Sequence, residues 1–399
     1  MATLSNINQI SHNGKDVLLM KLNGIIVYEK IIEDRGYCVE YTINKNDLYG
    51  SLSDNINLFL PRIYSTNSSY DYNYDSIEIT LLDGTVTTNT KTALQDISKI
   101  TLWYPETTKS IKFHTTSSSS YHRIENVNYC KTDGFVNMDY MFYGCTSLTK
   151  LNLRKFNTSN VINMAYMFNN CNKLTSLDLN NFDTSNVTDM RNMFASCNLL
   201  TKLNLSKFNT SQVTDMQAMF SNCNKLTSLD LSNFDTSNVT NMRAMFFDCG
   251  YSKISQNIVF GLTGLSNWDT GKVTNMSRMF AYSNIQTLDI SNWNMDNVTN
   301  TGLMFENCDI ASLDISNWIM NDTINTDNMF MNCYALHTLH LDNCNNNTIR
   351  KIITSVGFPT DEIIDAYGTK TPRKIYCKRV NAAGLENLLP DPWQFSYID

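Results

Sequence analysis

The chain has 399 residues, with 31 basic and 38 acidic side chains and a formal net charge of -7 at pH 7. This length predicts two or three structural units or one long repeat array. The acidic balance disfavours a phosphate backbone as a ligand, so nucleic acid is not an expected partner. Because only 17% of the residues are charged, we expect a neutral polar surface suited to hydrogen-bonded recognition.

The chain begins with MATLSNINQISHNGKD, which lacks a basic segment followed by an apolar run. No secretory leader is therefore predicted at this end, and synthesis in a cytoplasm is expected. No window approaches about 18 uncharged apolar residues, so a membrane span is not predicted either.

Residues 1–115 show no repeat and are predicted to form a β-rich N-terminal docking domain. The segment VLLMKLNGIIVYEK (17–30) has two apolar runs around Asn23-Gly24, a pattern typical of a hairpin. Further strands are expected at residues 37–43, 76–82 and 100–104. The Ser/Thr-rich stretch 107–121 is expected to be a linker or loop, and residues 116–134 are assigned to the linker and N-terminal cap.

From Phe135 to Cys344 the dipeptide Met-Phe recurs at a nearly fixed interval. Its phenylalanines are Phe142, Phe168, Phe194, Phe220, Phe246, Phe280, Phe305 and Phe330, separated by 26, 26, 26, 26, 34, 25 and 25 residues. Such a period predicts a solenoid, in which each unit buries its apolar face against its neighbours. One unit should not fold alone, because ordering each residue costs about 1.5 kcal/mol.

Each unit follows the spacing of a leucine-rich repeat. In the clearest copy, Leu174, Leu177, Leu179 and Phe182 match L-x-x-L-x-L-x-x-(N/C), with an aromatic residue at the last position. The Leu-x-Leu segment predicts a strand. The following residues 183–186 can cap a short helix, which the apolar spacing after them predicts. The predicted fold is an α/β solenoid, a leucine-rich-repeat array over residues 135–344 with a parallel sheet on one face and short helices on the other.

These residues carry a family resemblance. Runs such as LTSLDLSNFDTSNVTNMRAMFFDC (226–249) resemble the BspA-like leucine-rich repeats in surface proteins of gut and oral bacteria, mycoplasmas, some protists and gut phages. The resemblance covers about half of the chain and implies a non-catalytic adhesion or interaction role, with no catalytic residue to transfer. The LNG hairpin near the N-terminus also resembles docking modules in virion proteins of gut tailed phages.

One repeat column contains cysteines, which could bind a metal or form disulfides. Seven of the eleven cysteines lie three residues after the repeat phenylalanine, namely Cys145, Cys171, Cys197, Cys223, Cys249, Cys308 and Cys333. Because no C-x-x-C pair is present and Ser283 replaces one copy, buried thiols packing as small apolar groups are favoured over a metal ladder or a disulfide stack. The methionine columns are likewise interpreted as core filling, and no metal, cofactor or catalytic site is predicted.

The residue between the two strand leucines should point outward from the sheet. These residues form the candidate binding face, namely Asn152, Asp178, Asn204, Asp230, Asp289, Asp314 and His340, with Gly264 in a degenerate copy. They could hold a cation or bind sugar hydroxyls, although a solvated polar ladder is the favoured interpretation. Eight additional residues fall within 250–262, where Tyr251, Ser252 and Lys253 form a candidate insertion loop that is either a contact point or a tolerated insertion.

Residues 345–399 lose the period and are predicted to form a C-terminal capping unit, as a solenoid needs to cover its apolar end. A helix is expected near residues 348–356 and a strand at 374–377. The closing segment runs from Trp393 to Tyr397.

Two functional hypotheses follow. The leading one is a phage virion component, a tail or capsid appendage, with other virion proteins contacting the N-terminal domain. Its repeats would contact a host-surface protein or glycan. The alternative is a bacterial surface adhesin of the BspA-like type, located at the cell surface. An enzyme is not expected, because the five histidines show no H-E-x-x-H or comparable arrangement and no phosphate-binding or nucleophile motif occurs.

Overall fold

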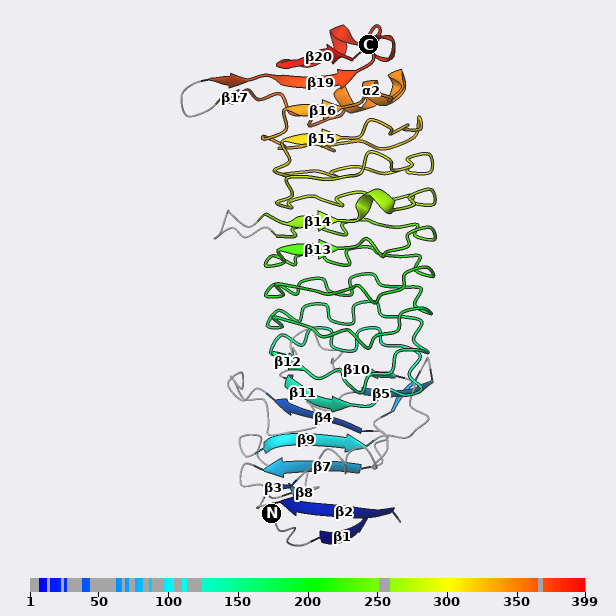
Figure 1. Cartoon of the computed structure of the whole chain (residues 1–399), viewed down its shortest axis with the longest axis vertical. Helices are drawn as coiled ribbons and strands as arrows, with labels where there is room; N and C mark the ends of the chain where they lie inside the picture. Colours follow the sequence, from blue (N-terminus) through cyan, green and yellow to red (C-terminus); the bar gives the residue numbers. More distant parts are fainter. Residues whose placement is uncertain are drawn as a thin grey trace.

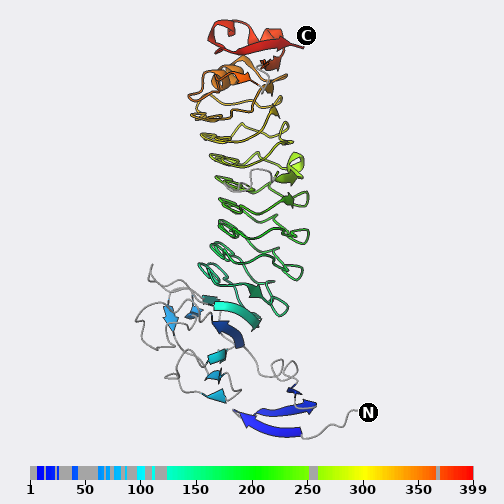
Figure 2. The ribbon, with the colours of Figure 1, turned by 90° about the vertical axis from the view of Figure 1, so that its left-hand side faces the viewer.

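The computed structural model describes residues 124–250, 259–364 and 369–398, together with ten shorter strands before them. These ten are β1 (Ile7–His12), β2 (Lys15–Leu22), β3 (Ile25–Ile26), β4 (Cys38–Ile43), β5 (Arg62–Thr66), β6 (Ser69–Asp71), β7 (Ser76–Leu81), β8 (Val86–Thr87), β9 (Ile97–Trp103) and β10 (Ser110–Lys112). The coils of the repeat stack into a rod, with these strands at one end and the C-terminal unit at the other (Figures 1 and 2).

The strands predicted in the N-terminal part are confirmed. β2 and β3 pair antiparallel across Asn23-Gly24, with Leu22 opposite Ile25. β4, β7 and β9 occupy the three other predicted positions. The stretch 107–121 is not wholly a linker, because it contains β10, in which Ile111 is fully buried.

A further strand joins the N-terminal sheet to the first coil. β11 (Ile124–Cys130) pairs antiparallel with β4 and parallel with β12 (Lys150–Leu151), giving the order β12-β11-β4-β9-β7-β8. The predicted cap at residues 116–134 therefore contains a strand shared by both parts. The domain boundaries themselves stay predictions.

The repeats form a leucine-rich-repeat-like solenoid, as predicted. Strands at the Leu-x-Leu position are short, namely β12, β13 (Ser228–Asp230), β14 (Gly261–Thr263), β15 (Ser312–Asp314) and β16 (Thr338–His340). The expected continuous eight-stranded sheet is instead interrupted, and β13 pairs with β14 while β15 pairs with β16. Between coils that lack an assigned strand, the Thr201 N–H lies 3.4 Å from the Thr175 carbonyl, which is a weak bond.

The predicted short helices are wrong, since turns occupy that segment in each described coil. In the second copy, the N–H groups of Met190, Asn192 and Phe194 donate to carbonyls of the next coil rather than within their own segment. The intervening Met193 N–H closes a three-residue turn on the Met190 carbonyl, and Asn192 has a φ of 55°. An α-helix needs bonds between residues i and i-4, so this alternation excludes it. Repeated turns place Met, Met, Phe and Cys inward at the same spacing as a helix would.

Two aromatic columns fill the core. The first is formed by the repeat phenylalanines, whose rings stack on those of adjacent coils at centroid distances of 5.3 to 5.8 Å. The second column contains the aromatic residue that follows each Leu-x-Leu segment. Its members, all buried, are Phe156, Phe182, Phe208, Phe234, Trp268, Trp293 and Trp318. The methionine columns are buried as well, which confirms their role in core filling.

The change from phenylalanine to tryptophan in the second column has a hydrogen-bonding reason. In the second coil, the Asn181 amide donates to the carbonyl of Leu153, where the preceding strand ends. In the later coils, the indole Nε1 of Trp293 donates to the equivalent carbonyl of Leu265 at 3.0 Å, and Trp318 does the same for Ile290. Either side chain therefore gives a second hydrogen bond to a carbonyl that already accepts a backbone N–H from its own turn.

The register at the insertion differs from the predicted one by one residue. Leu262 pairs with Leu229 and Thr263 with Asp230, so Thr263 rather than Gly264 occupies the outward position. Gly264 is an additional residue with a φ of 86°, followed by the 3-10 turn η4 (Leu265–Asn267). A Cβ on Gly264 would lie 2.3 Å from the Ser232 nitrogen. Only glycine fits this close approach of two coils.

We expect Gly264→Ala to lower the free energy of unfolding by well over ~1 kcal/mol, since it adds backbone strain to a steric clash. Urea unfolding monitored by circular dichroism measures the loss. Gly261→Ala is the matched control, because its Cβ would have no neighbour nearer than 3.8 Å. Equal stability of the two variants would contradict the assigned register.

The C-terminal unit follows the last coil at the end of the stack (Figure 1). It contains α2 (Asn346–Ile353), β17 (Ile363–Ile364), β18 (Lys370–Thr371), β19 (Arg373–Cys377), α3 (Arg379–Ala382), η5 (Glu386–Leu388) and β20 (Trp393–Tyr397). Parallel pairing continues from β16 to β19 and β20. The Asn345 side chain accepts the Thr348 N–H and caps α2, which begins two residues earlier than predicted. No helix in the described part of the chain has the length and hydropathy that crossing a membrane requires.

Candidate recognition surface

The candidate binding face lies on the strand side of the coils. Six of its seven residues are exposed, whereas His340 is half-buried and stacks on Tyr376 with ring centroids 4.7 Å apart. The residues follow one another along the rod at about 4.8 Å per coil, except that the coil of Thr263 lies between those of Asp230 and Asp289. Their placement on one side fits the predicted alternation, and their role in binding stays a prediction.

Most of these side chains also have a structural task. The Oδ1 atoms of Asn152, Asp178 and Asp230 each accept the backbone N–H two residues later, at 3.1 to 3.2 Å. Such a bond fixes the turn that ends the strand. Hydrogen bonds from Ser232, through its side chain and then its backbone, lower the pKa of Asp230. This observation favours the polar-ladder interpretation for the individual residues, while the face as a whole stays exposed.

The candidate insertion loop lies outside the described residues. Tyr251, Ser252 and Lys253 belong to the gap between residues 250 and 259. Their role as a contact point stays a prediction.

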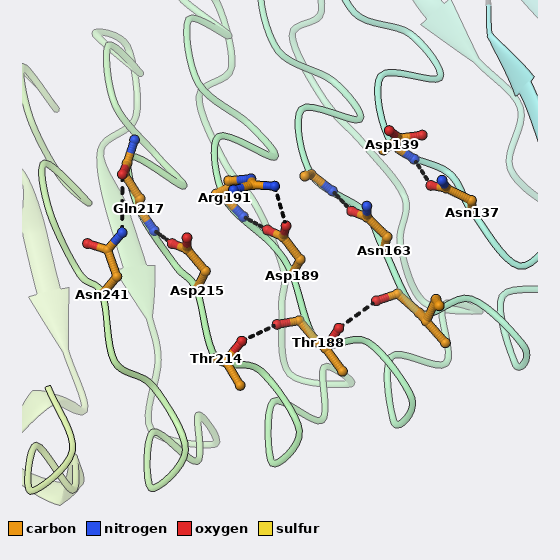
Figure 3. Close-up of polar contacts among 12 residues, drawn as sticks. Asn137, Asp139, Asn163, Thr188, Asp189, Arg191, Thr214, Asp215, Gln217 and Asn241 are labelled. Atoms are coloured by element: carbon orange, nitrogen blue, oxygen red, sulfur yellow. Dashed lines mark hydrogen bonds and ion pairs between the residues drawn. The ribbon is translucent and has the colours of Figure 1, made fainter. Parts of the chain in front are cut away.

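A second polar column lies on the opposite, turn side of the coils and was not predicted. Its members form parallel bridges from coil to coil and are Asn137, Asn163, Asp189, Asp215, Asn241, Asn275, Asn300 and Asn325. Figure 3 shows the Oδ1 of Asp189 accepting the Arg191 N–H, at 3.0 Å, and the same bond in the neighbouring coils. The recurrence of Asn or Asp before the first Met of each coil was the available sequence signal.

In this column, the charged form of the Asp189 side chain is destabilised by its surroundings. Its pKa is raised, mainly because burial penalises the carboxylate and to a smaller extent because of the charge of Asp215, while the backbone and charge of Arg191 oppose the shift. A raised carboxyl pKa means that the folded state binds more protons than the unfolded chain, so this contribution to stability improves as pH falls below neutral.

Asp189→Asn is therefore expected to leave stability at pH 7 unchanged or slightly higher, because the amide Oδ1 can still accept the Arg191 N–H. Asp189→Ala removes this bond and should cost about 1 kcal/mol. Chemical unfolding at pH 7 and pH 4.5 tests both, and the advantage of Asn over Asp should shrink at the lower pH. A larger loss for Asn than for Ala would contradict the assignment.

Two threonine columns connect the coils beside these residues. In the inner column, the buried Thr184 hydroxyl donates to the Asn209 carbonyl and accepts the Asn209 N–H, both at 2.8 Å. The buried hydroxyls of Thr210 and Thr236 likewise donate to a carbonyl of the following coil. In the outer column, the exposed Thr214 hydroxyl donates to the Thr188 carbonyl (Figure 3). Both columns hold the coils in register and therefore keep exposed side chains at fixed positions.

The described cysteines form a buried column, which confirms the interpretation of Cys as core. The seven cysteines of the repeat column are free thiols and buried, and the Cys197 Sγ donates to the carbonyl of Phe168 at 3.2 Å. Burial raises the pKa of Cys223 to about 12 and that of Cys308 to about 11. Among the residues placed by the structure, no group of three or more His, Cys, Asp or Glu side chains could hold a metal ion.

We expect Cys197 and Cys223 to resist alkylation in the folded protein, because the reactive thiolate is scarce and inaccessible. Iodoacetamide labelling read by peptide mass spectrometry should give rates that rise with urea in parallel with unfolding. Reductant and chelator together should leave Tm unchanged. Rapid labelling of either thiol in native buffer would contradict their burial.

The fold and this surface define a class of protein. A rigid stack of parallel coils keeps an inert core inside and a repeated polar face outside, an architecture that serves protein binding or surface recognition. The chain belongs to the family described as Mycoplasma protein of unknown function, DUF285, whose matches cover residues 109–226, 175–259 and 230–344. These overlapping matches span residues 109–344, more than half of the 399 residues. The narrower BspA-like relationship stays a prediction.

No curated protein matches the chain. Among solved structures, an internalin (inlF) from Listeria monocytogenes str. 4b F2365 is similar, with 13% identity, coverage of 71% of this chain and 87% of that chain, and a TM-score of 0.17. The two chains do not share one global superposition at this score, so the fold assignment rests on the coils described above.

Proposed function

We propose that the protein is a non-catalytic recognition protein of the bacterial cell surface, which binds a host or neighbouring-cell molecule through the strand side of its solenoid. The observation that carries this proposal is the exposed polar face, repeated from coil to coil over a core with no accessible reactive group. The fixed inter-coil bonds reduce the conformational entropy that the face would lose on binding.

The family match favours the cell surface over the virion as the location. It connects the chain to mycoplasma proteins, and we expect a repeat protein of this architecture to be exposed at the cell surface. No observation in the described coils or the comparisons favours a phage appendage, which was the leading hypothesis from sequence alone.

Binding of the full chain to a panel of host-cell extracellular proteins and glycans tests the proposal. Asp289→Arg places a bulky, oppositely charged group on the face and should reduce binding at least tenfold. Arg243→Glu reverses an exposed charge on the turn side and serves as the matched control.

A partner that binds both variants equally would place recognition elsewhere, and no partner in the panel would oppose the proposal. Antibody labelling of intact producing cells tests the location. Recovery of the protein with phage particles instead of cells would restore the virion hypothesis.

A further inference from the structure

The charge of the strand side is unevenly distributed along the rod. In the first and third coils, five exposed cations lie at or beside the strand, namely Lys150, Arg154, Lys155, Lys202 and Lys207, which we call the basic strip. Asp178 is the acid at the corresponding positions of the second coil. The fourth to eighth coils have Asp230, Asp289, Asp314 and Asp342 at these positions and no lysine or arginine. The chain as a whole is acidic, but positive charge is concentrated on the strand side of the first and third coils.

Four of the five cations in the basic strip have no acidic partner among the ion pairs of the described structure. The ion pairs found there join Lys131 to Asp133, Arg191 to Asp189, His340 to Asp342 and Lys370 to Glu362. Lys150, Arg154, Lys202 and Lys207 form no ion pair with a described acid. Four cations thus face solvent on one side of the rod, and an anionic ligand could pair with them.

The spacing of these cations follows from the repeat. Lys150 and Lys202 occupy the same position two coils apart, and so do Lys155 and Lys207. With about 4.8 Å per coil, equivalent charges lie about 10 Å apart along the axis. Between them the second coil supplies the exposed hydrogen-bonding side chains of Ser176 and Asn180, together with one acid, Asp178. Positive charges about two coils apart could pair with widely spaced acidic groups of a linear ligand. The hydroxyl and amide side chains between them could bind hydroxyl groups of the same ligand.

We propose that the basic strip binds a linear anionic polysaccharide with about one carboxylate or sulfate per disaccharide. This inference rests on the proposed recognition function and names its ligand class. The disaccharide length of an extended glycan is of the same order as two coils, so successive acids can reach successive charged coils. The Asn and Ser side chains of the second coil pair with sugar hydroxyls between them.

Other polyanions fit the strip less well. A planar anionic membrane lying along the strand side would also face Asp230, Asp289 and Asp314, which repel it. A nucleic acid has one phosphate per about 3.4 Å of each strand, a density that four or five cations over three coils cannot match. The ligand is therefore expected to be sparse in charge and narrow.

The test uses hyaluronan oligosaccharides, which have one carboxylate per disaccharide, and chondroitin sulfate as a more highly charged probe. Dextran, phosphatidylserine vesicles and a single-stranded DNA oligomer are the comparison probes. The test variant changes Lys150, Arg154, Lys202 and Lys207 to Gln in the full chain. The matched control changes the exposed Arg243, Lys272, Arg350 and Lys378 to Gln, so both variants lose four positive charges.

We expect wild-type and control proteins to bind the acidic polysaccharides with affinities within about twofold of each other. The test variant should bind at least about tenfold more weakly, because it loses four exposed charge contacts of a few tenths of a kcal/mol or more each. Wild-type binding should weaken as salt increases from 50 to 200 mM, because exposed charges are screened. Circular dichroism and urea midpoints equal to wild type show that both variants fold.

Three outcomes overturn the proposal. Equal losses in both variants indicate a response to net charge alone, and tighter binding to vesicles or DNA assigns the strip to another polyanion. Absence of binding to both polysaccharides excludes the ligand class. If neither polysaccharide binds but a protein partner still binds wild type and is lost with Asp289→Arg, the proposed recognition function stands without this ligand class.

Discussion

Replacing Phe220 by alanine is expected to lower the free energy of unfolding by about 3–5 kcal/mol. The ring is fully buried in the central coils and stacks between Phe194 and Phe246 at centroid distances of 5.8 and 5.7 Å. The loss therefore combines the removed apolar surface with a cavity that two rigid neighbouring coils cannot close.

Urea unfolding followed by both tryptophan fluorescence and circular dichroism measures this effect. Because each coil contacts only its neighbours, a weakened central interface should also make the transition less cooperative. The fluorescence of Trp268, Trp293 and Trp318 reports the C-terminal half, so the two signals should separate. Phe220→Leu is the control, with a smaller loss and coincident signals. A loss below ~1 kcal/mol for the alanine variant would mean that the column does not determine stability.

Replacing Arg373 by methionine is expected to cost about 3 kcal/mol or more and to destabilise the C-terminal unit first. This guanidinium is buried and donates to three backbone carbonyls, those of Leu336, Tyr334 and Asp361. It also lies 5.5 Å from the centroid of the Trp393 ring. Methionine fills much of the volume but leaves the carbonyls without donors, at about 1–3 kcal/mol for each one that stays buried.

Hydrogen exchange monitored by mass spectrometry should show early loss of protection in β19 and β20, while the central coils keep theirs. Arg350→Met is the matched control, because this arginine is exposed on α2. A change of that kind on the surface should stay within about 0.5 kcal/mol. Uniform loss of protection along the rod would contradict a capping role for Arg373.

The coil architecture could be predicted from sequence because one period governs the buried positions. The spacing of Phe142, Phe168 and Phe194 fixes which residues meet in the core, whatever the backbone conformation between them. The same periodicity could not distinguish a helix from successive turns, because both place Met190, Met193 and Phe194 inward. Bonds from Asn192 to the next coil decide between them, and such non-local bonds leave no local signature.

The candidate face was predictable in position but not in its full role. Alternation along Leu177-Asp178-Leu179 places Asp178 outward, and the structure agrees. The Asx bond of Asp178 depends on turn geometry that alternation does not encode. The register at Gly264 was misplaced because one additional residue directly after a strand cannot be distinguished, from sequence, from an ordinary degenerate repeat. The close approach of Gly264 to the Ser232 backbone reveals it.

The buried threonine column has a consequence for how such genes vary. Thr158 and Thr184 each make the same pair of bonds to the following coil, and Thr210 donates the equivalent bond to the Asp235 carbonyl. A duplication or deletion of one 26-residue unit therefore joins surfaces that are already complementary and leaves both ends unchanged. Recombination between the near-identical units would alter the length of the rod in steps of about 4.8 Å. Variants of this chain in related strains are thus expected to differ in reach by whole coils.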